Sequence, residues 1–295
     1  MDFVNQIFQG YIWIDYILIG LVGFFLLGAI SFKTKQDKTI KKTKYKQIWK
    51  RWFWILFTIF FIRTFLISPF RVPSGSMMPN LEINDLILMN KSAYGINIPF
   101  TNFYIFKSKP QVGDIIGLKF PLDNKLLISK RIIGEPGDLV FWNDKKQLFI
   151  NHILMPEIKK NERMWDGDFL NGGKNSTLTK FETKINNITY DIYKNNEKPA
   201  FKKNDIWATF DHELQKTKSP FFTIKMGELI NKNEPIKIPK DYYFVMGDNR
   251  DHSFDSRYFG FVHEKDIIGK VFYIYLNADC LLYGQKCERN LTGLN

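Results

Sequence analysis

The sequence has few cysteines and histidines, the usual ligands of zinc. Among its 295 residues there are only two cysteines, Cys280 and Cys287, and four histidines. The cysteines lack a CxxC spacing and no histidine pair lies near them, which argues against a zinc site. We therefore expect no zinc site. The two cysteines can form a small disulfide loop if the C-terminal region lies in an oxidising compartment; otherwise they are free structural thiols.

Positive charge is abundant, but most of it lies in one segment. The chain has a net charge of +12, and the segment from Lys33 to Arg51 contains nine Lys or Arg residues and one acidic residue, Asp37. No nucleic-acid-binding motif accompanies this charge, so we expect no nucleic acid as a partner. A basic block between two apolar runs is typical of a cytoplasmic loop in a membrane protein, which we place at 33–51.

Two apolar runs flank the basic block. The first, Tyr11–Phe32, is longer than the core of a signal peptide, lacks a small-residue cleavage pattern and matches a spanning helix of about 20 residues. The second, Trp52–Phe70, contains Arg63, whose side chain can reach the membrane surface from near one end of a helix. We predict two transmembrane helices, one within 1–32 after a short outer N-terminus and one at 52–70, with everything after Phe70 exported.

Beyond residue 70 the sequence is typical of β-structure. Short runs rich in branched and aromatic residues are bounded by Gly, Pro, Asn and Asp; they lie at 85–89, 114–120, 125–130, 138–142, 147–150, 242–246 and 270–276. The fold class is therefore predicted to be mainly β, with an exported antiparallel catalytic domain formed by 71–150 and 236–279. The more polar segment 151–235 is predicted to be an inserted smaller β subdomain, and 280–295 a C-terminal tail.

One short stretch after the second apolar run could carry chemistry. Arg71–Pro79 reads RVPSGSMMP, with two serines between two prolines and a glycine. Proline fixes φ and glycine opens backbone geometry closed to other residues, which favours a rigid loop with serine side chains at fixed angles. A serine held in this way is a candidate nucleophile. A Ser/Gly/Pro linker is the ordinary alternative for such a composition.

A serine nucleophile needs a neighbouring base, and the sequence offers two types. His252, in the segment GDNRDHS, is the histidine with a motif-like context, but no Gly-x-Ser-x-Gly elbow supports it. Lys130 lies at the end of an apolar strand. At the ordinary pKa only about one lysine in 2500 is neutral at pH 7. Burial would lower this pKa and make the amine a usable base, whereas a lysine facing water would remain charged.

Three fragments in order resemble one enzyme family. They are Pro73–Pro79, Lys130–Asp138 and Gly247–Arg257, and they follow the two apolar runs. Together they resemble bacterial type I signal peptidase, the leader peptidase, from the membrane segments to about residue 275. The resemblance implies a serine endopeptidase with a Ser/Lys dyad that cleaves signal peptides from exported preproteins and needs no metal or other cofactor.

The resemblance implies a role for each matched residue. Ser76 matches the nucleophile and Lys130 the general base. Ser74 matches the hydroxyl that stabilises the oxyanion together with the main-chain N–H of Ser76, and loss of one such donor typically costs a few kcal/mol. Ser253 matches the serine that orients the lysine amine.

Further positions are expected to support the site or to contact substrate. Asp255 and Arg257 match a structural ion pair, and Asp248 is expected to brace a turn. The candidate residues of the substrate pocket are Phe70, Val72, Met77, Leu81 and Ser129. Ser129 stands where the family normally has an apolar residue, so its hydroxyl can alter the desolvation of Lys130.

The resemblance also implies where the protein acts and with what. We expect a multi-pass protein of the bacterial inner membrane whose catalytic domain lies on the outer, periplasmic side. We also expect it to contact membrane lipid and to be monomeric. A processing peptidase serving one specialised export system would carry the same motifs. A tethered scaffold without activity has no need of all four residues of the expected site, and a soluble self-cleaving repressor has no need of two apolar runs.

Overall fold

The computed structural model describes residues 20–24, 26–27, 40–97, 104–121, 123–143, 145–165, 176–195 and 235–294. The chain forms two units: Met1–Ser68 with Gly95–Lys107, and Pro69–Tyr94 with Ser108–Asn295. Each unit is described by itself.

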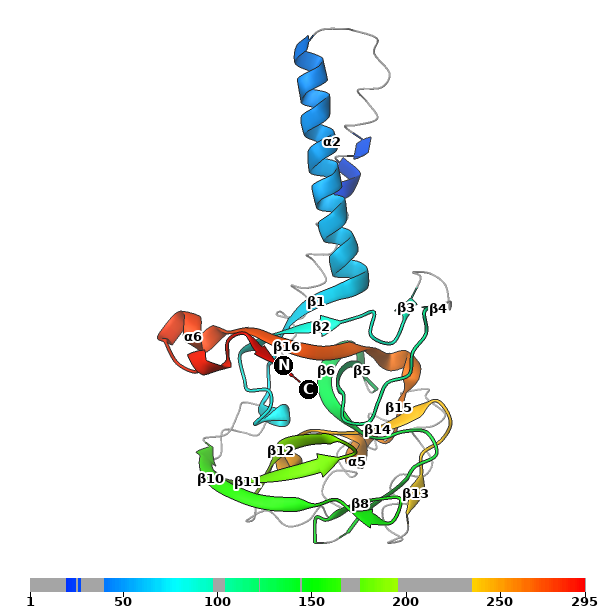
Figure 1. The fold of residues 1–295 in the computed structure, drawn as a ribbon, viewed down its shortest axis with the longest axis vertical. Coiled ribbons are helices and arrows are strands. Elements are labelled where there is room, and N and C mark those ends of the chain that lie inside the picture. The colour runs from blue at the N-terminus through cyan, green and yellow to red at the C-terminus, as the bar shows by residue number, and fades with distance from the viewer. Residues whose placement is uncertain are drawn as a thin grey trace. The chain divides into compact units, whose positions relative to one another are not determined.

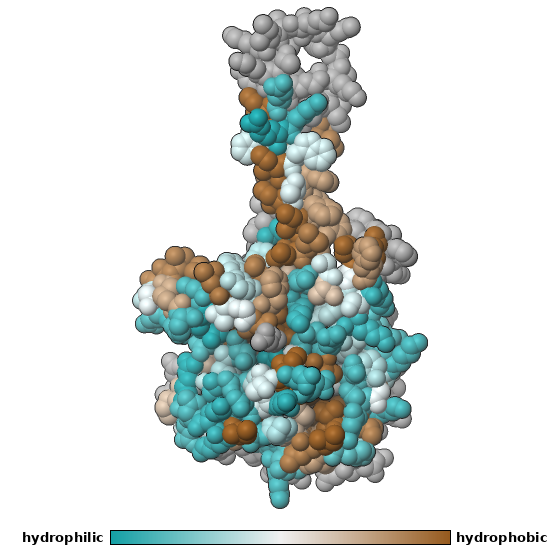
Figure 2. Space-filling model, viewed as in Figure 1, coloured by the Kyte–Doolittle hydropathy of each residue, from teal (hydrophilic) through white to brown (hydrophobic). Residues whose placement is uncertain are grey.

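The first unit contains one long helix. Helix α2 spans Ile40–Phe61, continues into a π-helical turn, Ile62–Leu66, and is accompanied by the short hairpin β3 (Ile96–Asn97) and β4 (Tyr104–Ile105). Aromatic side chains such as Trp54 are exposed along it, and Figure 2 shows hydrophobic surface along this helix. No helix in the part of the chain that the structure describes is both long and apolar enough to cross a membrane.

The helix differs from the predicted span at both ends. It begins at Ile40, inside the segment predicted as a basic loop, and it gives way to strand β1 (Ile67–Arg71) before Phe70. Pro69 accounts for the second difference, because proline disfavours helical geometry in the residue before it and cannot donate a backbone hydrogen bond. Most of the predicted first span, Tyr11–Phe32, lies outside the described residues.

The second unit is built on an antiparallel sheet, which confirms the mainly β prediction. Its strands run in the order β1-β2-β16-β5-β6-β14-β15, with β17 paired to β16, and β1 belongs to this unit from Pro69 onward. The bounds are β2 (Asp85–Asn90), β5 (Ile115–Phe120), β6 (Asp123–Gly134), β14 (Tyr242–Met246), β15 (Val262–His263), β16 (Ile267–Asn277) and β17 (Thr292–Gly293).

The central strands of this sheet bury both faces. On β5, Ile116 and Leu118 pack in one hydrophobic cluster while Ile115 packs in another. Side chains alternate between the faces of a strand, so adjacent isoleucines enter opposite layers. The sheet is therefore covered on both sides, which explains why β5 reads as a continuous apolar run instead of an alternating one.

Two smaller sheets complete the second unit, and Figure 1 shows β10–β12 at the opposite end of this unit from β2 and β16. One sheet contains β10 (Glu157–Trp165), β11 (Ser176–Ile185) and β12 (Ile188–Lys194). The other has the order β13-β7-β8-β9, with bounds Ile236–Lys237, Leu139–Trp142, Leu148–Ile150 and Ile153–Leu154.

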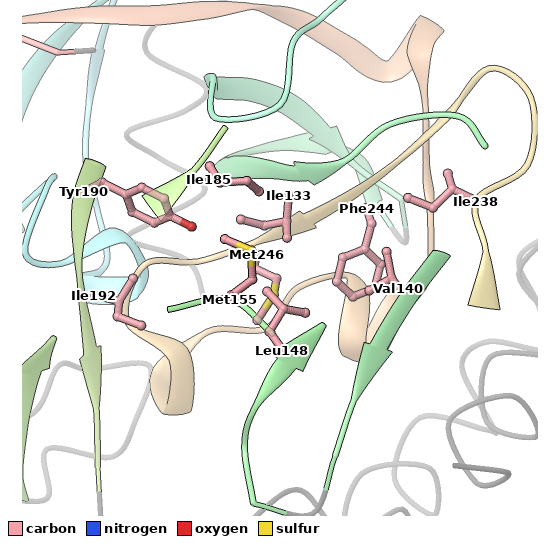
Figure 3. Close-up of a cluster of buried hydrophobic side chains, with 10 residues drawn as sticks. All are labelled: Ile133, Val140, Leu148, Met155, Ile185, Tyr190, Ile192, Ile238, Phe244 and Met246. Atoms are coloured by element: carbon pink, nitrogen blue, oxygen red, sulfur yellow. The ribbon is translucent and has the colours of Figure 1, made fainter. Parts of the chain in front are cut away.

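The segment predicted as an inserted subdomain shares its core with the rest of the unit. Ile185, Tyr190 and Ile192 of β11 and β12 lie in one buried cluster with residues of the main sheet, such as Ile133 and Met246. Figure 3 shows these side chains converging from different strands. The described strands of this segment therefore add a layer to the second unit and have this core in common with it.

The C-terminal segment is closed by a disulfide between Cys280 and Cys287, which decides between the two states that the sequence left open. The bridge joins helix α6 (Ala278–Tyr283) to the short turn Cys287–Arg289. Apolar side chains of α6, among them Leu281, are exposed (Figure 2). The remaining short helix of this unit, α5, spans Ser256–Phe259.

Candidate active site

The two serines lie in a closed loop between β1 and β2. The backbone N–H of Val72 donates to the carbonyl of Asp85 at 2.8 Å, and the N–H of Asn84 donates to the carbonyl of Val72 at 2.9 Å. Ser74 has extended geometry, and Gly75–Met77 form one 3₁₀ turn that contains Ser76. We call Val72–Asp85 the serine loop. Its ends are tied together, so Ser76 is held on a backbone with little freedom.

Ser76 contacts the end of the Lys130 side chain. The Nζ of Lys130 lies 2.7 Å from Oγ of Ser76, within hydrogen-bonding distance. The hydroxyl of Ser74 donates to the same oxygen over a longer distance, 3.4 Å. The structure thus brings together three residues that lie in two of the sequence fragments.

Lys130 is buried, with 3% of its surface exposed. Burial lowers the pKa of its amine from 10.5 to about 8; Asp255 and Asp248 oppose this shift, and Arg257 adds to it. At a pKa of 8 about one amine in ten is neutral at pH 7. The amine beside Ser76 is therefore a far better base than a lysine in water.

The segment Gly247–Ser253 packs against the serine loop. Nδ2 of Asn249 donates to the carbonyl of Gly75 at 3.0 Å, and its backbone N–H donates to the carbonyl of Ser76 at 3.1 Å. The hydroxyl of Ser253 is buried and makes no hydrogen bond within the part of the chain that the structure describes. The Ser253 hydroxyl and the carbonyl of Ser76 both lie close to the Cα of Gly247.

Two buried ion pairs surround this segment. Arg131 holds Asp248 through two parallel bonds of 2.9 Å, and it also donates to the carbonyl of Gly113 at 2.7 Å. Asp255 and Arg257 form a second paired contact with two bonds of 2.8 Å. Paired geometry of this kind satisfies the donors of the guanidinium and the carboxylate oxygens together, as buried charges require.

The carboxylate of Asp255 also holds the backbone of the active-site segment. Its Oδ2 accepts from the N–H of Gly247 at 2.9 Å, and its side chain accepts from the N–H of Arg257 at the start of α5. Burial acts to raise the pKa of Asp255, but Arg257, the N–H of Gly247 and the charge of Lys130 together bring this pKa below its ordinary value. The carboxylate thus stays charged beside the lysine.

The structure buries three of the five residues expected to line a substrate pocket. Val72, Met77 and Leu81 belong to one buried cluster and expose at most 5% of their surface. Phe70 packs on this cluster and is half-buried, and Ser129 is also half-buried. Phe70 and Ser129 are therefore the two expected pocket residues with surface available to a substrate.

The alternative base of the sequence analysis has different surroundings. His252 is buried, and its ring meets the ring of Trp165 edge-on with centroids 4.4 Å apart. In the described ranges no group of three or more His, Cys, Asp or Glu residues could hold a metal ion.

Sequence reasoning missed two residues that hold the site. Arg131 follows Lys130 directly, and strand alternation alone could have placed it on the opposite face from the lysine. Asn80 donates to Asp248 and to the carbonyl of Asp191, both at 2.7 Å. No local signal marks Asn80, because its partners lie more than 100 residues away.

Known proteins are similar in sequence to this chain over most of its length. Residues 45–276 match the family described as signal peptidase, peptidase S26. A signal peptidase I of Buchnera aphidicola subsp. Baizongia pistaciae is 36% identical over 275 residues, covering 84% of this chain and 82% of the relative. A signal peptidase I of Pseudomonas fluorescens is 31% identical, covering 82% and 76%. A signal peptidase I of Aquifex aeolicus is 31% identical, covering 77% and 82%.

Proposed function

The chain belongs to the signal peptidase family, peptidase S26, and from this premise we propose that it removes signal peptides by a Ser76/Lys130 acyl-enzyme mechanism. The observation that carries the mechanism is the 2.7 Å distance between Oγ of Ser76 and Nζ of Lys130, an amine that is almost wholly buried. A hydroxyl next to a neutral amine is the arrangement that an activated serine requires.

The proposed first step forms a covalent intermediate. Neutral Lys130 takes the proton from the hydroxyl of Ser76 while Oγ attacks the scissile carbonyl carbon. The negative charge that develops on the carbonyl oxygen is stabilised by the backbone N–H of Ser76 and the hydroxyl of Ser74. The C–N bond then breaks, Lys130 returns its proton to the leaving amine, and the signal peptide remains attached to Ser76 as an ester.

The second step releases the signal peptide. Lys130, neutral again, takes a proton from water, whose oxygen attacks the ester carbonyl. The proton then passes to Oγ of Ser76 as the ester bond breaks, so the enzyme returns to its starting state. Ser253 is proposed to orient the lysine amine, supported by its burial next to the serine loop. Asp248, Asp255 and Arg257 are proposed to keep these groups in place.

The proposed substrates are exported preproteins, bound in extended form along a strand edge with main-chain hydrogen bonds and shallow side-chain pockets. Phe70 and Ser129 are the proposed pocket residues, since they retain exposed surface. We propose that the protein is monomeric, needs no cofactor and is bound to the inner membrane by its two apolar segments, with the catalytic unit on the outer side. The exposed aromatic residues of α2 support contact with lipid.

The test is cleavage of a purified preprotein in detergent by the wild type and four variants. Ser76→Ala and Lys130→Met should abolish cleavage. Lys130→Arg should be equally inactive, because a guanidinium keeps the positive charge but stays protonated at neutral pH and so cannot accept the proton of Ser76. His252→Ala serves as the matched control at the alternative base and should retain activity. Activity in Lys130→Met with loss in His252→Ala would make histidine the base, and failure of the wild type to cleave any preprotein would favour a scaffold.

A further inference from the structure

Arg289 lies beyond the region that matches the family, yet it contacts the serine loop directly. Its Nε donates to Oδ1 of Asp85 at 3.0 Å, and its Nη2 donates to Oδ2 of Asp85 at 2.6 Å. The same guanidinium donates to the carbonyls of Asn80 at 2.9 Å and Pro79 at 3.4 Å. One side chain thus reaches both the end of the serine loop and its middle.

Asp85 is the point where the serine loop closes. Its carbonyl accepts from the N–H of Val72, and its carboxylate accepts from the N–H of Glu82 at 2.8 Å and from Nδ2 of Asn277 at 2.7 Å. The side chain of Asp85 is fully buried, so its charge requires a cation, and Arg289 provides it. The ion pair therefore stabilises the closed form of the loop.

Asn80 carries this contact toward the catalytic residues. Its carbonyl binds Arg289, while its side-chain amide donates to Oδ2 of Asp248 at 2.7 Å. Asp248 is paired with Arg131, the neighbour of Lys130 on β6. Asn80, four residues after Ser76, is thus held at its carbonyl by Arg289 and at its side chain by Asp248 of the Arg131–Asp248 pair.

The segment that presents Arg289 is itself fixed. The turn Cys287–Arg289 is joined by the disulfide to α6. At the start of α6, the N–H of Ala278 donates to the carbonyl of Asn84 at 3.0 Å, and Asp279 accepts from the side chain of Asn84 at 2.7 Å. Arg289 is therefore presented to the loop by a segment attached to that same loop.

We propose that Arg289 is a positioning residue that fixes the serine loop so that the hydroxyl of Ser76 stays aligned with the amine of Lys130. The inference rests on the proposed Ser/Lys mechanism. A displacement of reacting groups by about 1 Å can lower a rate a hundredfold, so the loss of these contacts affects turnover more than substrate binding.

The test compares kcat and KM of the full-length protein with Arg289→Met and Arg289→Lys. Arg289→Met should lower kcat ten- to a hundredfold with KM within twofold of the wild type. Arg289→Lys keeps a charge opposite Asp85 but lacks the planar fork that reaches two carbonyls as well, so it should recover only part of kcat. The pH midpoint of kcat/KM should stay unchanged in both, because neither substitution alters the burial of Lys130.

Lys286→Asn is the matched control. Lys286 lies on the same segment and forms ion pairs with Glu82 of the serine loop and with Asp279, but its described contacts reach neither Asp85 nor the carbonyls of Pro79 and Asn80. Its φ of 58° suits asparagine, so the substitution removes charge without backbone strain. Lys286→Asn should keep kcat within twofold of the wild type.

The outcomes separate this inference from the proposed mechanism. If Ser76→Ala is inactive while Arg289→Met keeps the kcat of the wild type, the positioning role is wrong and the mechanism stands. Cleavage by Ser76→Ala would contradict the mechanism itself. If Arg289→Met does not fold, Arg289→Lys decides: a normal kcat overturns the proposal, and a reduced kcat at unchanged KM and unchanged pH midpoint supports it.

Discussion

The Cα of Gly247 packs directly against the backbone of Ser76. A methyl group on this glycine would lie 2.4 Å from the carbonyl oxygen of Ser76 and 2.2 Å from Oγ of Ser253, closer than any stable contact. The side chain of Ser253 could rotate away, but the carbonyl of Ser76 belongs to the backbone that carries the proposed nucleophile. The absence of a side chain at 247 therefore sets how closely the serine loop approaches this segment.

Gly247→Ala should lower kcat/KM about a hundredfold, because relieving the clash shifts Ser76 relative to Lys130 by a distance of ångström order. Preprotein cleavage assays measure this loss. Gly293→Ala is the control, since a methyl group there meets no atom within 4 Å, and it should be fully active. Activity of Gly247→Ala within twofold of the wild type would show that the serine loop absorbs the clash without moving Ser76 away from Lys130.

The pH dependence of cleavage should follow the amine of Lys130. The reaction needs the neutral form, and burial brings the pKa of this amine to about 8. We expect kcat/KM to fall tenfold per pH unit well below pH 8, to reach half its maximum near pH 8 and to level off above it. A pH–rate profile with a soluble preprotein tests this. A midpoint near 10.5 would mean that the lysine behaves as if it were in water.

Lys130 should also lower the stability of the folded protein. Because the folded pKa lies below the unfolded value of 10.5, the unfolded chain binds more protons between pH 8 and pH 10.5, and stability rises with pH across this window. Lys130→Met should therefore be inactive but more stable at pH 7, by up to about 3 kcal/mol for this shift in pKa. Urea unfolding at several pH values measures the difference.

The gain from Lys130→Met should depend on pH in a defined direction. It should be full below pH 8, shrink as pH rises through the window and vanish near pH 10.5, where the amine is neutral in both states. A gain that is constant from pH 6 to pH 10 would show that better apolar packing, and not the removal of a buried charge, stabilises the variant.

The Arg131–Asp248 pair should be essential to the fold. Arg131→Met should lower the free energy of unfolding by about 3 to 5 kcal/mol, because it leaves the carboxylate of Asp248 buried without a cation. The double variant Arg131→Met/Asp248→Asn should recover part of this loss. Lys159→Met, which breaks an exposed pair with Glu162, is the control and should leave stability nearly unchanged. Equal effects of the two single substitutions in urea unfolding would contradict the argument.

The strands could be predicted because their signals are local. Runs such as 114–120 and 242–246 are apolar, branched and bounded by turn residues, and they coincide closely with β5 and β14. The family resemblance likewise identified Ser76 and Lys130 as a pair. Their contact depends on two segments more than 50 residues apart, and the motif fragments supplied the link between them.

Features that depend on long-range packing could not be predicted. The composition of 151–235 predicted an inserted subdomain, but it gave no sign that residues such as Ile192 in the described part of this segment pack in one core with the main sheet. The burial of Val72 and Leu81, two of the expected pocket residues, is likewise decided by strands far along the chain. Arg289 gave no signal at all, since an arginine near a C-terminus usually faces water.

Strand β6 presents two basic side chains on its two opposite faces. Lys130 reaches Ser76 on one face, and Arg131 reaches Asp248 on the other. A shift of this strand by one residue against β5 would exchange the faces and bring a guanidinium, which stays protonated in proteins, to Ser76, the proposed nucleophile. The pairing of Lys130 with Ile116 and of Arg131 with Ile115 thus selects between an enzyme and an inert fold. Folding must therefore align β6 with β5 in this one register if the protein is to be active.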